Sequence, residues 1–399
     1  MRVLFVNLVY GVGSTGKIIA DIANLLRKAG NDVRMLYGAG ADSSDVDAQR
    51  TSGRLEYYTH NALSRLTDHA GLYSRTATRR LIHEIKDFQP DLIHLHTLHG
   101  FYVNYEILFH FLREAGIPVV WTLHDCWSFT GHCTHFSQIK CTQWQTECQN
   151  CRLLRRYPQC YGKGDVRRNF LRKKAAFTGV KNLVITTPSQ WLASQVAQSF
   201  LQDYPRVVIP NGIDRTVFQP RTSDLRKRHH LESKKIVLGV ASAWSAQKGL
   251  SDLLSLADRL GPDYQVVLIG LTAKQLSHIP PNVLGLSRTA NQIELAQWYT
   301  AANVFVNPTY EETFGLTTVE AQACGTPAVV YETDGCPETL ATGGSVLTTQ
   351  GDLDGLERAV RDIVQRDICV SPRKTERFDK ERTYEEYIRL YKRMCGGTK

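Results

Sequence analysis

The 399-residue sequence has no apolar run close to the roughly 20 residues of a membrane-spanning helix. It also has no internal repeat and no low-complexity tract. The apolar start, residues 1–9, is short and is followed by glycines instead of a small-x-small cleavage site, so we expect a first β-strand and not a signal peptide. These absences argue against a membrane-embedded or repetitive architecture and favour a cytoplasmic globular protein.

Composition and charge narrow the class further. With 42% hydrophobic and 22% charged residues the chain has the make-up of a globular protein, and its length predicts two domains. The 48 Lys and Arg residues outnumber the 39 Asp and Glu residues by nine, which suits an anionic partner such as phosphate, nucleic acid or acidic lipid headgroups. The ten cysteines would be mostly reduced in the cytoplasm, and their clustering favours metal binding or packing over disulfides.

Strand-like and helix-like segments alternate along the chain. Short apolar runs predict strands at 2–9, 32–37, 91–96, 118–123, 182–187, 235–242, 264–269, 303–307, 326–331 and 345–347. Such alternation is typical of an α/β fold with doubly wound parallel sheets. A Pro-Asn-Gly turn after a further apolar run predicts a boundary near residue 205, between domains at 1–205 and 206–379, and an amphipathic helix is expected within 380–399.

Two acids, Glu312 and Glu320, follow the strand expected at 303–307 and are separated by seven residues. Thr317 and Thr318 are candidate helix starts, which would put Glu312 in a loop and Glu320 one turn into a helix. Carboxylates at these positions are good acceptors for sugar or ribose hydroxyls.

The residues between these acids add a second property. Backbone N–H groups of Phe314, Gly315 and Leu316, at a helix N-terminus, can bind an anion such as a diphosphate. A ligand that suits this loop has phosphates in its middle and hydroxyl groups at both ends, as a nucleotide sugar does. The loop therefore predicts a nucleotide-sugar site at the carboxyl end of a parallel strand.

The Glu312-x7-Glu320 spacing, with Phe-Gly-Leu inside it and Ala-x-Ala-x-Gly-x-Pro after it, resembles the donor motif of retaining GT-B glycosyltransferases of family 4. The resemblance implies two Rossmann-like domains facing a central cleft, with a UDP- or GDP-sugar bound by the C-terminal domain. Glu320 would bind the ribose and Glu312 would act on the sugar ring as a catalytic residue. It also implies hexosyltransferase chemistry without a catalytic metal, and a C-terminal helix that packs back on the N-terminal domain.

Lys248, which is followed by a glycine, matches the Lys-Gly pair of that family and would balance the charge of a leaving diphosphate. The family usually carries an arginine five or six residues earlier. Here those positions hold Ala243 and Ser242, so the diphosphate clamp lacks one cation, and Arg288 is a candidate replacement.

A glycine-rich loop that contains Gly13 follows the first expected strand. It has the Gly-x4-Gly-Lys pattern of a P-loop, ending at Lys17, but Ile18 stands where magnesium binding needs Ser or Thr. We therefore expect no ATPase. Like the glycine loop of the family, it would let the backbone approach donor phosphate or acceptor.

The strand expected at 118–123 ends at His124-Asp125, which resembles the His-Asp pair near the transferred sugar in many GT-B enzymes. A neutral imidazole at His124 would take or relay the acceptor proton, with Asp125 orienting it. His96 and His99, near the end of the preceding strand, are candidate acceptor contacts. A structural hydrogen-bonding role is the alternative for each histidine.

Six cysteines lie between residues 126 and 160. Cys148-x2-Cys151 is a common half of a zinc site, and Cys133 and Cys141 would complete four thiolates that brace a long loop. Further candidate ligands are Cys126, His132, His135 and Cys160. Trp-Thr-Leu-His-Asp followed by a Cys-rich insert is similar to glycosyltransferases of colanic-acid or exopolysaccharide biosynthesis.

The segment 152–174 carries nine basic residues against one acid, Asp165, with apolar residues between them. A segment with one sign of charge suggests an anionic partner, and we favour a membrane surface on the inner face of the cell membrane. The acceptor would then be a glycan linked to a lipid diphosphate, with a free glycan as the alternative. No nucleic acid is expected, because no recognition module accompanies the charge.

These features predict a retaining glycosyltransferase that moves a sugar from a nucleotide sugar to a glycan or lipid-linked glycan in surface polysaccharide biosynthesis. Two alternatives stay open. One is a nucleotide-sugar epimerase of GT-B fold, and the other is a zinc-containing protein that binds nucleic acid.

Overall fold

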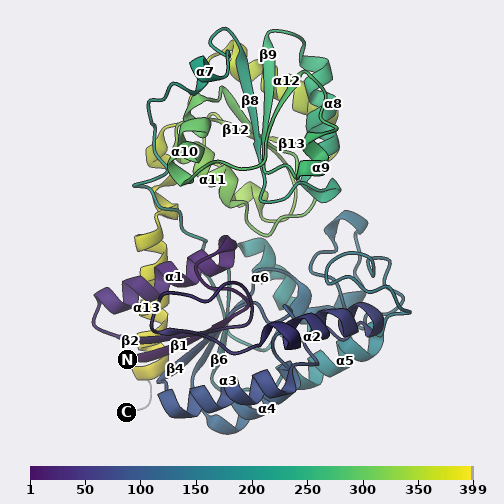
Figure 1. Ribbon diagram of the computed structural model, residues 1–399, viewed down its shortest axis with the longest axis vertical. Coiled ribbons are helices and arrows are strands. Elements are labelled where there is room, and N and C mark those ends of the chain that lie inside the picture. The colour runs from purple at the N-terminus through teal and green to yellow at the C-terminus, as the bar shows by residue number, and fades with distance from the viewer. Residues whose placement is uncertain (397–399) are drawn as a thin grey trace. The chain divides into compact units, whose positions relative to one another are not determined.

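The computed structural model describes residues 1–396, which form two compact units. Unit 1 comprises Met1–Pro210 together with residues 383–396, and unit 2 comprises Asn211–Arg382. Each unit is a β-sheet with helices on both of its faces (Figure 1).

The sheet of unit 1 has seven strands that are all parallel to their neighbours. In chain order they are β1 (Arg2–Asn7), β2 (Asp32–Tyr37), β3 (Ala48–Arg50), β4 (Leu92–Leu95), β5 (Val119–Thr122), β6 (Leu183–Thr187) and β7 (Arg206–Val208). Their order across the sheet is β3-β2-β1-β4-β5-β6-β7, with Val3 of β1 paired to Leu92 of β4. The direction of winding reverses between β1 and β4, which marks the switch point where such sheets bind ligands.

Alternate residues of these strands pack on opposite faces of the sheet. The helices of this unit are α1 (Gly13–Lys28), α2 (Arg54–Thr67), α3 (Arg75–Phe88), α4 (Tyr105–Ala115), α5 (Val166–Phe177), α6 (Gln190–Ala197) and α13 (Lys380–Gly396). Val3 and Phe5 of β1 face one cluster with α1 and α13, whereas Leu4 and Val6 face the other cluster with α3, α4, α5 and α6.

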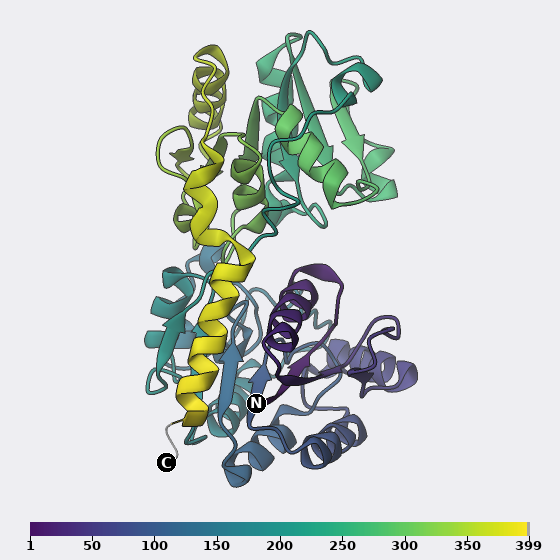
Figure 2. The same cartoon turned by 90° about the vertical axis from the view of Figure 1, so that its left-hand side faces the viewer.

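The C-terminal helix α13 lies along the sheet of unit 1 (Figure 2). Its buried face carries Tyr384, Tyr387 and Tyr391. The Tyr391 hydroxyl bonds His94 Nδ1 at 2.7 Å, and the Tyr387 hydroxyl bonds Thr122 Oγ1 at 3.2 Å. A segment that follows unit 2 in the sequence thus completes the core of unit 1.

Unit 2 repeats the same winding with six parallel strands. They are β8 (Lys235–Val240), β9 (Tyr264–Ile269), β10 (Val283–Leu286), β11 (Val304–Asn307), β12 (Ala328–Tyr331) and β13 (Val346–Thr348), in the order β10-β9-β8-β11-β12-β13. Its helices are α7 (Leu225–Arg228), α8 (Leu250–Leu260), α9 (Ala273–Leu276), α10 (Gln292–Ala301), α11 (Leu316–Ala323) and α12 (Leu353–Gln365). Its switch point lies between β8 and β11.

The predicted α/β class with doubly wound parallel sheets is confirmed. Strands β2 and β9 coincide with the predicted ranges 32–37 and 264–269. Two strands were missed, β3 and β10. Both are short, β3 is polar, and β10 contains Gly285, so neither has the β-branched run that identifies a buried strand.

Candidate functional site

At the switch point of unit 2, the loops that follow β8 and β11 lie against each other. Lys248 ends the single 3₁₀ turn 246–248 after β8, and Glu312 lies in the loop after β11. The amide of Tyr310 donates to the Gln247 carbonyl at 2.8 Å, and the Thr309 hydroxyl donates to the same carbonyl at 3.1 Å. Residues 64 positions apart in sequence are thereby placed side by side.

Gly249 makes this close approach possible. Its φ of +70° is in the left-handed region, and a Cβ built there would lie 2.1 Å from the carbonyl oxygen of Pro308. Only glycine meets both conditions, so the Lys-Gly sequence reports a tight contact between two loops.

Lys248 and Glu312 form an ion pair. The Lys248 Nζ lies 2.6 Å from Glu312 Oε2, and their side chains are 33% and 23% exposed. Burial lowers the pKa of Lys248, but the Glu312 carboxylate more than offsets this, so its pKa is raised overall. Lys248 therefore presents a charged, half-buried ammonium at the carboxyl edge of the sheet, where Glu312 holds it.

The backbone of Glu312 is braced by the turn after β12. Its amide donates to Asp334 Oδ2 at 3.0 Å, and its carbonyl accepts from the Gly335 amide at 3.0 Å. The turn that follows β12 thus reaches the predicted acidic loop and holds it in place from the end of a third strand.

Helix α11 begins at Leu316, so the predicted start at Thr317 or Thr318 is wrong. The physical reason is Gly315, which takes the N-cap position with φ +95° and turns the chain into the helix earlier. No side chain caps this terminus. Phe314 is buried against the ring of Phe378 at 5.6 Å, so its side chain anchors the loop and leaves only its backbone for ligand binding.

The terminus has the properties of an anion site, because the first N–H groups of a helix have no intrahelical acceptor. The amides of Gly315 and Leu316 lie at this point. Glu320 lies one turn further into α11, as predicted.

Glu320 is held by a residue that the sequence did not single out. The hydroxyl of Tyr299, on α10, donates to Glu320 Oε2 at 2.9 Å. Burial, followed by the neighbouring carboxylate, raises the pKa of Tyr299 well above its ordinary value, so it stays a donor. The 20 residues between them carry no local signal, and only the packing of α10 on α11 brings Tyr299 and Glu320 together.

The positions where the family carries an arginine, Ser242 and Ala243, follow β8 directly. Arg288 is exposed and lies beyond the end of β10, which is separated from β8 by β9 alone. Since all these strands are parallel, Arg288 lies at the same edge of the sheet as Lys248.

In unit 1 the glycine-rich loop joins β1 to α1. Gly13 is the first residue of α1 and has φ +64°, and no side chain caps this helix either. The loop is closed by a bond from the Gly11 amide to the Gly16 carbonyl at 3.1 Å. A Cβ at Gly16 would meet Gly11 and Val9 at 3.2 Å, so the loop is compact as well as uncapped.

The predicted histidines of unit 1 fall into two pairs. His96 Nδ1 and His124 Nε2 are 3.0 Å apart, with stacked rings. His99 Nε2 lies 2.8 Å from Asp125 Oδ2, and the other Asp125 oxygen accepts from the Trp127 amide at 2.9 Å. The prediction that Asp125 orients His124 is therefore wrong, because its carboxylate holds His99 instead.

The imidazoles of the first pair are kept neutral by burial. Burial lowers the pKa of His124 to about 4, although Asp125 partly opposes the shift. Burial and the neighbouring His94 and His124 rings lower the pKa of His96 well below its ordinary value. His124 is therefore neutral at pH 7 and can accept a proton, but a pKa of about 4 makes it a weak base.

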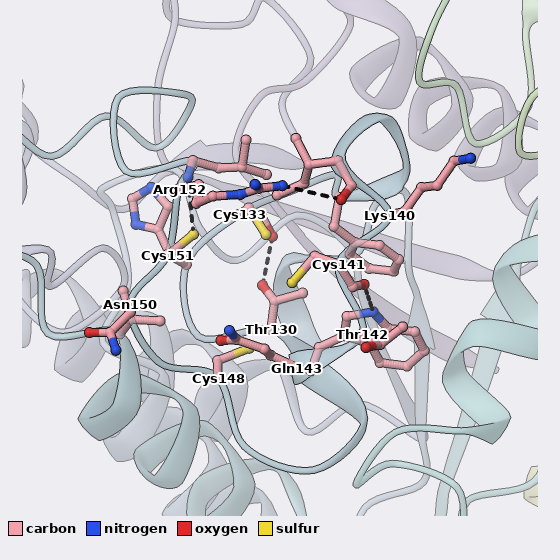
Figure 3. Close-up of a pocket in the computed structure, with 16 residues that line it drawn as sticks. Thr130, Cys133, Lys140, Cys141, Thr142, Gln143, Cys148, Asn150, Cys151 and Arg152 are labelled. Atoms are coloured by element: carbon pink, nitrogen blue, oxygen red, sulfur yellow. Dashed lines mark hydrogen bonds between the residues drawn. The ribbon is translucent and has the colours of Figure 1, made fainter. Parts of the chain in front are cut away.

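Four of the six clustered cysteines line one cavity in unit 1, of about 390 Å³ (Figure 3). They are the four predicted metal ligands Cys133, Cys141, Cys148 and Cys151. Every cysteine of the chain is free of disulfides. Among residues 1–396, no three His, Cys, Asp or Glu side chains are already arranged as metal ligands.

Part of the basic segment 152–174 serves the fold. Lys173 is buried and donates to the carbonyls of Trp127 at 2.7 Å and Thr130 at 3.0 Å, and burial lowers its pKa to about 7. Arg167 pairs with Glu147. The segment is therefore less free to bind an external anion than its sequence suggests.

Exposed apolar side chains of α2 lie close to the basic segment 152–174. Leu55, Tyr58 and Leu66 of α2 are 82%, 65% and 66% exposed and share one helix face. The amide of Tyr161, itself exposed, donates to the carbonyl of Arg65 at 2.6 Å and joins the basic segment to α2. Within residues 1–396 no helix is long and apolar enough to cross a membrane.

Two family models match the sequence. The one described as Glycosyltransferase Family 4 matches residues 15–217, and the one described as Glycosyl transferases group 1 matches residues 221–382. A putative colanic acid biosynthesis glycosyl transferase, WcaC of Escherichia coli K12, is 22% identical over 76% of this chain and 77% of its own. A D-inositol 3-phosphate glycosyltransferase of Arthrobacter is 31% identical, over 43% of this chain and only 44% of its own length.

Solved structures match along the whole chain. Sucrose-phosphate synthase of Thermosynechococcus elongatus has a TM-score of 0.73 at 17% identity and covers all of both chains. Anabaena HepE, solved with UDP and glucose, has a TM-score of 0.66 at 19% identity and covers 98% of this chain and 99% of its own.

Proposed function

The chain belongs to glycosyltransferase family 4, and from that membership we propose that it transfers a hexose from a nucleotide sugar to a glycan acceptor with retention of configuration. That it is a glycosyltransferase of GT-B fold, with relatives in polysaccharide biosynthesis, is confirmed. The epimerase alternative finds no support in these matches, and membership of an enzyme family argues against the nucleic-acid-binding alternative.

The observation that carries the proposal is the Lys248–Glu312 pair at the switch point of unit 2, next to the uncapped end of α11. An ammonium and free backbone N–H groups on neighbouring loops suit the diphosphate of a nucleotide sugar. Glu312 holds Lys248 until the donor binds. Because these groups stabilise the departing diphosphate, the reaction needs no catalytic metal.

The carboxylates take the hydroxyl groups at the two ends of the donor. Glu320, oriented by Tyr299, would bind the ribose, and Glu312 would bind hydroxyls of the transferred sugar. Arg288, at the same sheet edge, would supply the second cation that Ser242 and Ala243 cannot.

Unit 1 carries the acceptor side. His124 would accept the proton of the attacking hydroxyl, with His96 as its hydrogen-bond partner. The His99–Asp125 pair would hold acceptor hydroxyls, and the Gly13 loop offers an uncapped helix start to a phosphate.

We test the donor first by thermal unfolding with UDP, GDP, ADP and their sugars, at fixed salt and without added magnesium. The uridine series is favoured because Anabaena HepE binds UDP. Saturating nucleotide should raise the unfolding temperature by mass action. If none of these nucleotides or nucleotide sugars raises the unfolding temperature, the donor assignment is wrong.

The Lys248→Ala variant tests whether Lys248 stabilises the departing diphosphate. Losing the cation at the diphosphate should reduce turnover by about 100-fold or more, since a transition-state donor is worth about 3 kcal/mol. Lys227→Ala, at an exposed position of α7, is the matched control and should keep full activity. Equal activities of the two variants would refute the role of Lys248.

For the acceptor we propose a glycan linked to a lipid diphosphate at an anionic membrane surface. The exposed apolar face of α2 would insert at the headgroup boundary, while Arg54, Arg65, Lys163 and Arg168, all exposed, meet acidic lipids. Apolar and basic side chains on one surface are what such a membrane recognises.

Vesicle flotation tests this surface. The protein should float with vesicles containing phosphatidylglycerol, float less with pure phosphatidylcholine, and lose binding at high salt. A Leu55→Glu, Leu66→Glu double variant should bind at least tenfold more weakly, whereas Ile293→Glu, an exposed apolar position of unit 2, should not change binding. Binding that is indifferent to both lipid charge and the α2 variant would exclude this surface.

A further inference from the structure

The Cys-rich segment of unit 1 lacks the usual means of holding a loop in place. Between β5 and α5 it forms only three single-turn 3₁₀ helices, at Trp127–Phe129, Ser137–Ile139 and Gln143–Gln145. None of its cysteines forms a disulfide. A loop of this length, with so little secondary structure, needs another source of stability.

Its cysteines divide by position. Cys133, Cys141, Cys148 and Cys151 line one cavity, and in Figure 3 their sulfur atoms face the same space. Cys160, in the same segment, is fully buried but is not among the residues that line the cavity. Four thiols from one segment thus border a single cavity.

Backbone amides already donate to two of these sulfurs. The Leu153 amide donates to Cys151 Sγ at 3.3 Å, and the backbone of Gly131 bonds the Cys148 thiol. A Cβ at Gly131 would lie 2.4 Å from the Val166 carbonyl oxygen, so the close approach of the loop backbone to the start of α5 requires glycine. N–H donors to sulfur stabilise thiolates and orient them as ligands.

A buried histidine next to the cavity provides an independent observation. His132 lines it, and its side chain is fully buried. Its Nδ1 bonds the carboxylate of Asp68, which is itself buried, but its Nε2 is buried with no partner. A carboxylate that fixes one ring nitrogen while the other is left unsatisfied is the arrangement found around metal sites.

We propose that Cys133, Cys141, Cys148 and Cys151 bind one structural zinc ion, with His132, which donates from Nδ1 to Asp68, as an outer-shell residue beside it. Each thiol would pass its proton to water as its sulfur bonds the ion, at about 2.3 Å. The side chains must move inward from their present positions, because they are not yet arranged as ligands. The site is separate from the proposed transfer chemistry and would brace the loop that follows His124 and Asp125.

The test uses the full-length protein, purified under reducing conditions, with zinc content and cobalt substitution as readouts. We expect one zinc per chain, and a cobalt form with the intense sulfur-to-metal charge-transfer band of four thiolates. Removing the zinc with a chelator should lower the unfolding temperature of unit 1. A folded wild-type chain that binds no metal, or a cobalt spectrum without thiolate bands, would overturn the proposal.

Variants assign the ligands. Cys148→Ser and Cys141→Ser should each lower zinc affinity by at least 100-fold and weaken the charge-transfer band, while the buried control Cys160→Ser should keep both. His132→Gln should weaken affinity by 10- to 100-fold and leave the four-thiolate spectrum intact, as expected for an outer-shell residue. Loss of metal in Cys160→Ser equal to that in Cys148→Ser, or a three-thiolate spectrum in the wild type, would refute this ligand set.

Discussion

Burial keeps several histidines of unit 1 neutral, and hydrogen bonds fix their tautomers. His60 is the clearest case, because its Nε2 accepts from the Gly71 amide at 3.2 Å and its Nδ1 lies 2.7 Å from Ser74 Oγ. An acceptor nitrogen cannot carry a proton, so the ring must be the neutral Nδ1–H tautomer. Burial lowers the pKa of His60 to about 3.

This predicts a loss of stability in mild acid. Below the unfolded pKa of 6.5 the unfolded chain binds a proton that native His60 does not, so stability falls as pH falls toward the folded value. From pH 6.5 to pH 5 this one group should cost about 2 kcal/mol. The Gln amide in His60→Gln can replace both hydrogen bonds but does not titrate. Between pH 6.5 and pH 5 the free energy of unfolding, measured with denaturant, should therefore fall by about 2 kcal/mol more in the wild type than in His60→Gln.

Exposed His83 on α3 provides the control. His83→Gln should leave the pH dependence unchanged. If it removes as much of the slope as His60→Gln does, burial is not the cause.

Short sequence motifs predicted part of the candidate site. Lys248 and Glu312 were each identified from their own motifs, and the structure brings them to 2.6 Å. Tyr299 and His94 were missed as partners, because their neighbours come from other elements. The roles of all these residues in catalysis remain predictions.

At the scale of elements, the proposed donor site depends on how closely two loops meet. Gly249 carries that contact, since its backbone is left-handed and lies against Pro308. The start of α11 depends similarly on Gly315. Sequence reasoning placed the helix one or two residues late because it weighed side-chain caps and not a glycine that turns the chain by itself.

Gly249→Ala should therefore separate the loops. Backbone strain alone costs about 1–3 kcal/mol, and the contact with Pro308 adds to it, so we expect more than 3 kcal/mol of lost stability and weaker nucleotide binding. Gly116→Ala, which is also left-handed but has nothing within 4 Å, isolates the strain. Equal losses in unfolding experiments would show that the contact contributes nothing.

At the scale of the whole molecule, two sheets with the same winding order follow from repeated strand and helix periodicity. That much was predictable from local patterns. The packing of α13 on unit 1 was implied only by resemblance, since an amphipathic face does not name its partner.

Tyr391→Ala tests how far α13 supports unit 1. The change removes a buried ring and its bond to His94, which should cost about 3–5 kcal/mol. Hydrogen exchange should then lose protection in the strands of unit 1 and keep it in those of unit 2. Tyr58→Ala, exposed on α2, should alter neither, and equal loss in both units would contradict a role confined to unit 1.

The position of α13 also sets an order of events during synthesis. Unit 2 is one uninterrupted stretch, whereas unit 1 needs residues made after all 172 positions of 211–382. At about 5–20 residues per second, roughly 9–34 s separate the two parts of unit 1 as the nascent chain leaves the ribosome. Until then His94 and Thr122 lack the bonds that Tyr391 and Tyr387 of α13 make with them. The unit encoded first is therefore the last to close.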